Sequence, residues 1–157
     1  MMLKGFRYQL EFELLIIEKN HKIYAITTHE NYDYILEETS LIKMAAKQLD
    51  EYFNGKRQQF DLPLDLTGTI FQTKVWQELL KIPYGQTKSY KDIATAINNP
   101  KAYRAVGMAN NKNRIMIVVP CHRVISSDNK LTGYAGGLEK KEFLLNLESK
   151  YYNYKDK

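Results

Sequence analysis

The heptapeptide VVPCHRV, residues 118–124, contains the only cysteine of a 157-residue chain. The apolar run IMIVV, residues 115–119, leads into it, and its length and β-branched residues predict a short buried strand. Pro120 ends that strand, so we expect Cys121 at a strand end, where reactive side chains are commonly exposed. A lone cysteine is more often a small buried hydrophobic residue, so a structural interpretation stays open beside a nucleophilic one.

A base beside the thiol would favour the nucleophilic interpretation, because the thiolate is the reactive form of cysteine. His122 and Arg123 follow Cys121 directly. Neighbouring side chains of an extended strand point to opposite faces, so His122 reaches the thiol only if the chain turns here or a water joins them. A histidine base usually has an orienting carboxylate. The spacing leaves four acidic residues open for that place: Asp128, Glu139, Glu142 and Glu148.

The composition restricts the class of protein. Hydrophobic residues make up 44% and charged residues 26% of the chain, as in ordinary globular domains. No apolar stretch is long enough to span a membrane, and acidic residues interrupt the apolar N-terminal stretch, unlike in a secretory signal. We therefore expect a cytoplasmic protein without membrane contact, or a nuclear one if the source cell has a nucleus. A single cysteine predicts no internal disulfide and no Cys-rich zinc site, and three scattered histidines suggest no other metal site. We expect no cofactor.

Charge is distributed unevenly along the chain. Residues 1–80 hold 9 Lys and Arg against 12 Asp and Glu, a net charge of −3. Residues 81–157 hold 14 against 6, a net charge of +8. This asymmetry suggests a polyanionic partner for the second half, and a solvated basic face is the alternative.

The first part of the chain, residues 1–65, predicts an N-terminal αβ lobe. Alternating apolar residues predict one strand over residues 6–18, and residues 21–29 predict a second strand after a hairpin turn. Residues 40–55 predict a helix that Ser40 caps and a glycine ends.

A second lobe is expected over residues 66–157, because residues 60–66 are extended and contain a proline. In this lobe Ser89 is followed by Asp92 three residues later. That spacing is typical of a capping box and predicts a short helix that begins at Tyr90.

A further short helix is predicted over residues 100–110, with Asn99 as its N-cap. Four small or apolar residues are expected to face inward from it: Ala102, Ala105, Val106 and Ala109. Two short helices joined by a tight turn in a basic region are a helix-turn-helix candidate, although most such pairs bind nothing. Other helices are predicted over residues 69–83, before this pair, and over residues 138–151, with a frayed tail beyond.

The motif VVPCHRV, with ANNKN upstream and GYAGGLEKKEFLL downstream, resembles the O6-alkylguanine-DNA alkyltransferase family, the methylated-DNA–protein-cysteine methyltransferases. The resemblance covers residues 69–148 and includes FQTKVWQELLKIPYG, SYKDIA, NPKAYRAVG and KEFLLNLE. It implies an α/β protein, with an N-terminal strand-and-helix lobe and a C-terminal, mostly helical, winged helix-turn-helix lobe. That second lobe would bind DNA and carry the active cysteine. Residues 1–65 match only in general character.

The resemblance also implies a reaction and a partner. The reaction is direct reversal of DNA damage, by irreversible transfer of the alkyl (methyl) group from O6-alkylguanine to Cys121 after the base is flipped out. O4-alkylthymine is a second candidate substrate. The partner is DNA containing the lesion, the chain is expected to act as a monomer, and each chain acts once.

The family motifs assign catalytic roles residue by residue. Cys121 is the acceptor, and His122 with Glu148 helps to form its thiolate. Asn113 structures the turn that holds the active site. The Tyr90 hydroxyl donates to the extruded guanine.

Further residues are implied around the DNA and the base. Arg104 enters the base stack in place of the guanine. Other implied DNA contacts are Ser89, Tyr90, Lys101, Ala102 and Arg123. The implied lining of the base pocket is Met116, Val124, Tyr134, Ala135 and Gly136. Ala135 stands where a serine is common in the family, and Met116 stands where some members carry a proline.

Two alternatives of other classes stay open. One is a non-catalytic protein of the same fold that binds damaged bases, although such proteins lack the cysteine. The other is a Cys–His hydrolase, which would turn over repeatedly. Taken singly, Arg104 also fits a surface arginine, Tyr90 a packing residue and Asn113 a loop cap.

Overall fold

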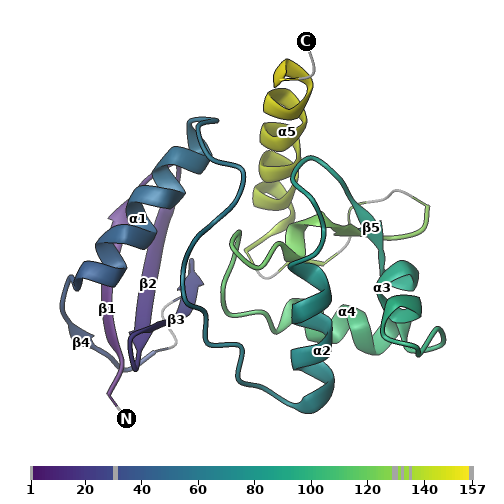
Figure 1. The fold of residues 1–157 in the computed structure, drawn as a ribbon, viewed down its shortest axis with the longest axis horizontal. Coiled ribbons are helices and arrows are strands. Elements are labelled where there is room, and N and C mark those ends of the chain that lie inside the picture. Colours follow the sequence, from purple (N-terminus) through teal and green to yellow (C-terminus); the bar gives the residue numbers. More distant parts are fainter. Residues whose placement is uncertain (1, 30–31, 129–130, 132, 135, 156–157) are drawn as a thin grey trace. The chain divides into compact units, whose positions relative to one another are not determined.

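A sheet comes first along the chain and a group of helices follows it (Figure 1). The structure is a computed structural model and describes residues 2–29, 32–128, 131, 133, 134 and 136–155, without the side chains of residues 153–155. The chain divides into two compact units, Met1–Leu66 and Thr67–Lys157. The predicted α/β class, with a strand-and-helix lobe before a mostly helical lobe that carries the cysteine, is confirmed.

The sheet of the first unit is built around its second strand. Its strands, in the order β3-β2-β1-β4, are β1 (Lys4–Gln9), β2 (Glu13–Lys19), β3 (Lys22–Thr27) and β4 (Ile35–Leu36). Antiparallel pairing joins β1 to β2 and β2 to β3, whereas β4 runs parallel to β1. Residues 14–17 of β2 are fully buried, which is expected for a central strand covered on both faces. Helix α1 (Ser40–Phe53) lies along one of these faces (Figure 1).

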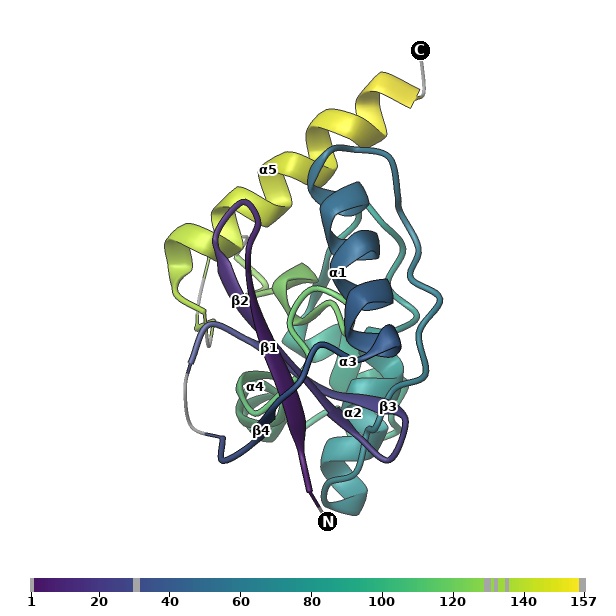
Figure 2. The ribbon, with the colours of Figure 1, turned by 90° about the vertical axis from the view of Figure 1, so that its left-hand side faces the viewer.

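The single strand predicted over residues 6–18 is wrong. The chain reverses at residues 10–12, so that Gln9 pairs with Glu13 in a hairpin, which Figure 2 shows lengthwise. Alternating apolar residues do not distinguish one long strand from two short strands joined by a short loop. Phe12 sits in that loop and packs edge-to-face on Phe53, with ring centroids 5.4 Å apart.

The next hairpin and the helix cap also differ by a residue or two from expectation. Asn20 and His21 have φ of 51° and 63°, the two-residue turn that matches strand twist. Helix α1 is capped by Thr39 and not by Ser40, since the Thr39 hydroxyl accepts from the Ile42 N–H at 3.1 Å.

The second unit consists of helices and one short parallel strand pair. In chain order its elements are α2 (Ile70–Leu79), β5 (Lys88–Ser89), α3 (Tyr90–Ala96), α4 (Tyr103–Asn111), the 3-10 helix η1 (Cys121–Arg123), β6 (Val124–Ile125) and α5 (Leu138–Lys155). Helices α2, α3 and α4 pack on one another. The Trp76 indole N–H donates to the Ala109 carbonyl at 2.9 Å and ties α2 to α4.

Helix α4 begins three residues later than predicted. Asn98 takes a left-handed φ of 60° and ends α3, and the Ala102 N–H then donates to the Asn99 carbonyl in a separate turn. Asn99 is therefore part of a turn and not a cap. Val106 and Ala109 face inward as predicted, whereas Ala105 is exposed.

Helix α5 continues through Lys155, beyond the end predicted at residue 151. Tyr152 packs against the turn at Gly85, whose φ of 79° suits glycine. A Cβ atom at Gly85 would lie 2.6 Å from the Tyr152 ring. Within the described part of the chain, no helix has the length and apolar character needed to cross a bilayer.

Candidate active site

The segment between α4 and η1 is a buried turn organised by the side chain of Asn113. Its Nδ2 donates to the carbonyl oxygens of Ile115 and Val119, at 3.2 and 2.9 Å, and its Oδ1 accepts from the Ile115 N–H at 3.0 Å. Ile117 lies between these bonds at φ 73°, which a β-branched residue adopts only where its surroundings hold it. The strand predicted over residues 115–119 is wrong, because this side chain bonds the backbone into a turn.

The same amide reaches the cysteine. Asn113 Nδ2 donates to the Cys121 sulfur at 3.2 Å, and Asn110 Nδ2 donates to the Cys121 carbonyl oxygen at 3.3 Å. Cys121 is only 2% exposed and begins η1, so it lies on a tight turn and not at an exposed strand end. The turn of the chain that His122 needs to approach the thiol is therefore present.

His122 and Glu148 form a buried pair beside this turn. His122 Nε2 lies 2.6 Å from Glu148 Oε2, and the two side chains are 0% and 1% exposed. Arg123 donates to both carboxylate oxygens, from Nε at 2.8 Å and from Nη2 at 3.0 Å. The Gly85 N–H donates to Glu148 Oε1 at 3.2 Å. Of the four acidic residues that the sequence left open, Glu148 is the one bonded to the histidine.

The protonation states in this network follow from burial and from the partners. Burial alone would raise the pKa of Glu148, but His122 and Arg123 hold it well below its usual range. Burial lowers the pKa of His122 below its ordinary value, against the pull of Glu148. The imidazole is thus neutral at pH 7 and donates its Nε2 proton to the carboxylate, which can only accept. His122 Nδ1 is then an acceptor, and it is buried without a bond to any described residue.

The thiol itself is protonated at rest. Burial raises the pKa of the Cys121 thiol from 9.0 to about 11, although the Asn113 hydrogen bond and the Lys141 ammonium both act to lower it. Lys141 is fully buried and donates from Nζ to the Val124 carbonyl at 2.7 Å. Burial lowers the pKa of Lys141 from 10.5 to about 8, which leaves it mostly charged at pH 7. The Lys141 ammonium thus acts on a thiol that needs to lose one proton, and a neutral imidazole follows that thiol directly in the chain.

Two family models match the chain. The model of the DNA binding domain of 6-O-methylguanine DNA methyltransferase matches residues 70–150, and the model of its ribonuclease-like domain matches residues 12–66. The chain belongs to the 6-O-methylguanine DNA methyltransferase family. The family predicted from the PCHRV motif and its flanks is confirmed.

Named relatives of the methyltransferase family cover most of the chain. The chain is 58% identical over 113 residues to the methylated-DNA–protein-cysteine methyltransferase of Methanosarcina barkeri, which is 72% of each chain. It is 55% identical over 122 residues to the constitutive Bacillus subtilis enzyme, 77% of this chain and 73% of that one. Its structure is similar to the Mycobacterium tuberculosis O6-methylguanine methyltransferase, with a TM-score of 0.89 at 40% identity, over 96% of this chain and 94% of that chain. The M. tuberculosis protein in complex with DNA gives a TM-score of 0.82 at 39% identity over the same shares.

The methyltransferase resemblance places five residues around the base, and the structure brings three of them together. A Cβ atom at Gly136 would lie 2.7 Å from Met116 Cε and 3.0 Å from the Tyr134 ring, so these three residues lie close together. The Tyr134 hydroxyl is buried without a bond to any described residue. Val124 is fully buried in β6, and Ala135 lies outside the described residues.

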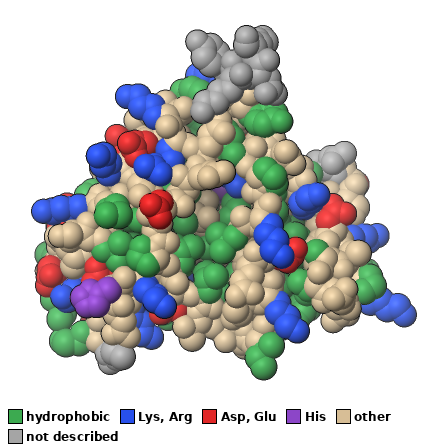
Figure 3. Space-filling view, viewed as in Figure 1, with side chains coloured by type: hydrophobic (Ala, Val, Ile, Leu, Met, Phe, Trp, Pro, Cys, Tyr) green, Lys and Arg blue, Asp and Glu red, His purple; other side chains and the backbone are tan. Residues whose placement is uncertain are grey.

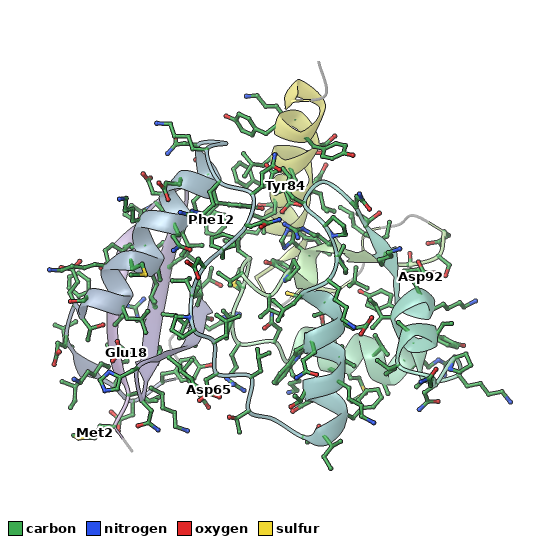
Figure 4. All side chains as sticks on the ribbon, viewed as in Figure 1. Met2, Phe12, Glu18, Asp65, Tyr84 and Asp92 are labelled. Atoms are coloured by element: carbon green, nitrogen blue, oxygen red, sulfur yellow. The ribbon has the colours of Figure 1, made fainter. Side chains whose placement is uncertain are left out.

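The predicted capping box at the start of α3 is confirmed. The Ser89 hydroxyl accepts from the Asp92 N–H at 3.0 Å, and the Asp92 carboxylate accepts from the Ser89 N–H at 2.9 Å. Figure 4 labels Asp92 at this helix start. Tyr90 is the first residue of α3, half-buried, with its ring 3.7 Å from the position of a Cβ atom at Gly107 in α4. The structure thus holds Tyr90 between the two helices of the pair.

The remaining predicted DNA contacts lie at the start of α4. Lys101 and Arg104 are exposed, and Ala102, the N-cap residue, is half-buried.

The prediction that Arg123 contacts DNA is wrong. Its side chain is 7% exposed, and its guanidinium bonds Glu148 and donates from Nη1 to the Ile82 carbonyl at 2.7 Å. The guanidinium carbon also lies 5.7 Å from the ring centroid of Tyr84, which Figure 4 labels beside α5. The Arg123 guanidinium is bonded to the Glu148 carboxylate inside the protein, so it is not exposed to contact a phosphate.

Sequence reasoning missed Lys141 and Asn110. One signal was present for Lys141: residues 141, 144 and 148 recur at helical spacing, so Lys141 shares a face of α5 with buried Leu144 and Glu148. No local pattern marks Asn110, because its bond to the Cys121 carbonyl joins residues 11 positions apart.

Proposed function

We propose that the protein repairs alkylated DNA by moving the alkyl group of O6-alkylguanine onto the sulfur of Cys121, once per chain. One observation carries the proposal: the only thiol is held by Asn113 on a buried turn that continues directly into the His122–Glu148 pair. The family of the chain and the names of its relatives support the same reaction. The M. tuberculosis relative in complex with DNA supports DNA as the partner.

The chemical step requires the thiol proton to leave. In the proposal it passes to His122 Nδ1, which accepts from no described residue, and Glu148 stabilises the imidazolium that forms. The Lys141 charge favours the thiolate. The sulfur then forms a bond to the alkyl carbon, the carbon–O6 bond breaks, and its electron pair stays on the guanine oxygen. The thiol proton ends on the guanine, so the products are an unmodified base and a thioether.

The alkyl carbon has to be brought to a buried sulfur, so the base leaves the duplex. In the proposal Arg104, exposed on α4, fills the gap in the stack. The Tyr90 hydroxyl donates to the base, and a backbone N–H near the leaving oxygen stabilises the negative charge that develops on it. In the proposal Tyr134, Met116, Gly136 and Val124 line the pocket that receives the base.

The product explains why each chain would act once. A thioether is a poor leaving group, and the chain has no second cysteine to attack it. The alkylated sulfur also adds volume to a packed site, which is expected to cost about 1–3 kcal/mol of stability.

The test uses duplex DNA with a labelled O6-methylguanine, and a parallel duplex with O4-methylthymine. We expect one equivalent of label on the wild-type protein, located at Cys121 by mass spectrometry. Cys121→Ser is expected to bind the duplex with unchanged affinity and to transfer more than about 10⁴-fold more slowly, as for the loss of a covalent nucleophile.

Two results would favour the alternatives. Tight binding with no label on the protein, under conditions that transfer label to a known relative, indicates a non-catalytic binder. Turnover beyond one equivalent, with unmodified Cys121 recovered, indicates a hydrolase.

A further inference from the structure

Helix α4 exposes a large apolar side chain between two cations. Arg104 and Met108 are four residues apart and share one face of the helix, and Lys112, the C-cap residue, follows after four more. Met108 is 69% exposed, while Val106 and Ala109 of the same helix are buried. The site described above does not use Met108.

The surroundings of Met108 indicate a polyanion as the occupant of this face. Residues 93–122 contain four Lys and Arg and no Asp or Glu. On α3, the Lys91 ammonium lies 5.5 Å from the ring centroid of Tyr103, which is itself 38% exposed at the start of α4. Figure 3 shows Lys and Arg side chains scattered over the visible face of the second unit.

We propose that Met108 is a second side chain that α4 places into the duplex, one helical turn from Arg104, where its thioether packs on the base and sugar edges beside the extruded nucleotide. The inference rests on the proposed function and adds to it a contact that is apolar and not ionic. Met is among the residues that groove-binding proteins insert at opened base steps. Its unbranched chain adapts to any neighbouring base pair, as a repair protein without sequence preference needs.

The face around Met108 suits a close approach. Ala105 is exposed and small, and Gly107 lies over the Tyr90 ring, so the helix backbone can come near the groove floor. Because Lys112 lies four residues beyond Met108, it can neutralise a backbone phosphate while the thioether is buried. A second copy of the chain would meet the same cations on its own face and be repelled.

The decisive variant is Met108→Ala, compared with Ile70→Ala as a matched control. Ile70 is 81% exposed at the start of α2, in the same unit but on another helix. We expect Met108→Ala to slow alkyl transfer from duplex DNA about tenfold, the effect of losing one buried apolar side chain, and to leave transfer from free O6-methylguanine unchanged. Met108→Leu is expected to recover most of the duplex rate, and Ile70→Ala to match wild type.

A second readout separates an apolar contact from an ionic one. The salt dependence of duplex binding should be unchanged in Met108→Ala, whereas Lys112→Ala should lower the slope of log K against log salt by about one. A fluorescent base analogue opposite the lesion reports opening of the stack, and its signal should fall in Met108→Ala.

Three outcomes overturn the inference about Met108. They are a wild-type duplex rate in Met108→Ala, an equal loss on duplex and free base, or a wild-type dimer in sedimentation that this substitution abolishes. If the wild-type protein transfers no alkyl group at all, the proposed function fails, and duplex binding with the fluorescence readout still decides whether Met108 contacts DNA.

Discussion

Two buried carboxylates, Glu18 in the first unit and Glu148 in the second, are held in different ways. Glu18 in β2 is 6% exposed and accepts from the Thr39 hydroxyl at 2.6 Å. Thr39 also caps α1, so this bond ties the start of the helix to the sheet. Glu148 is 1% exposed and accepts from Gly85, His122 and Arg123.

The difference lies in the chemistry of the donors. A hydroxyl is neutral and has no proton to exchange near pH 7, so the Glu18 bond can only stabilise the fold. Glu148 is bonded to a guanidinium that keeps it ionised and to an imidazole that can still accept a proton at Nδ1. A buried carboxylate thus takes part in proton transfer when one of its donors can itself titrate.

Replacing each carboxylate in turn should give the largest difference between the two sites. Glu148→Gln is expected to slow alkyl transfer by about 10²–10³-fold, because the imidazolium loses its partner. It is also expected to lower the free energy of unfolding by about 3–5 kcal/mol, because Arg123 stays buried without a counter-charge. Single-turnover kinetics and urea denaturation measure the two effects.

Glu18→Gln is the matched control for Glu148→Gln. It should cost about 1 kcal/mol of stability and leave the transfer rate within about twofold of wild type. Equal rate losses in the two variants would contradict a special role for Glu148.

Removing the amide of Asn113 should have the next largest effect. Asn113→Ala takes away the bonds that hold Ile117 in its left-handed conformation, and about 2–3 kcal/mol of stability should be lost. The thiol also loses a donor that lowers its pKa, so the transfer rate should fall about tenfold. Asn54→Ala, which removes a side-chain bond at the end of α1, should leave the rate unchanged. A wild-type transfer rate in Asn113→Ala would mean that Asn113 stabilises the fold and has no effect on the thiol.

The charge of Lys141 should be visible in the pH dependence of stability. Its pKa is lowered to about 8 in the folded protein, so between pH 8 and 10.5 the unfolded chain binds more protons than the folded one. The free energy of unfolding should therefore rise with pH from 8 upward. The Cys121 thiol acts in the opposite direction above pH 9, so the measurement is confined to pH 7–9.

In Lys141→Met the rise of the free energy of unfolding between pH 7 and 9 should disappear. The transfer rate at pH 7 should also fall, by about tenfold, since the thiolate loses a nearby positive charge. Lys140→Met, the adjacent residue on α5, should preserve both the rise and the rate. If the free energy of unfolding still rises with pH in Lys141→Met, another titrating group causes the rise.

The smallest expected difference is between the two helix caps. Ser89→Ala removes a capping bond from α3 and should cost about 1 kcal/mol. Thr39→Ala removes the same kind of bond from α1 and also leaves Glu18 without its hydroxyl donor, so it should cost about 1 kcal/mol more. Thermal unfolding of both variants measures the difference, and equal costs would mean that solvent replaces the Thr39 hydroxyl at Glu18.

Local features of the chain could be predicted from its sequence. The Ser89–Asp92 capping box forms as expected, because both of its bonds join residues three positions apart. The buried face of α4 at Val106 and Ala109 follows from helical spacing in the same way. The PCHRV motif with its flanks was sufficient for the family, since a family signature is a property of the sequence.

The resemblance implied that Asn113 structures the active-site turn, but only the tertiary structure decided which backbone groups it bonds. Residues 115–119 have the composition of a strand, and a side chain two to six positions away makes them a turn. Arg123 and Glu148 are separated by 25 positions. No local spacing could therefore show that Arg123 is buried against a carboxylate, or which of the four acidic residues bonds the histidine. The physical reason is the same in each case: a buried polar group takes whichever partner the folded chain brings within hydrogen-bond distance, and that partner can lie anywhere in the sequence.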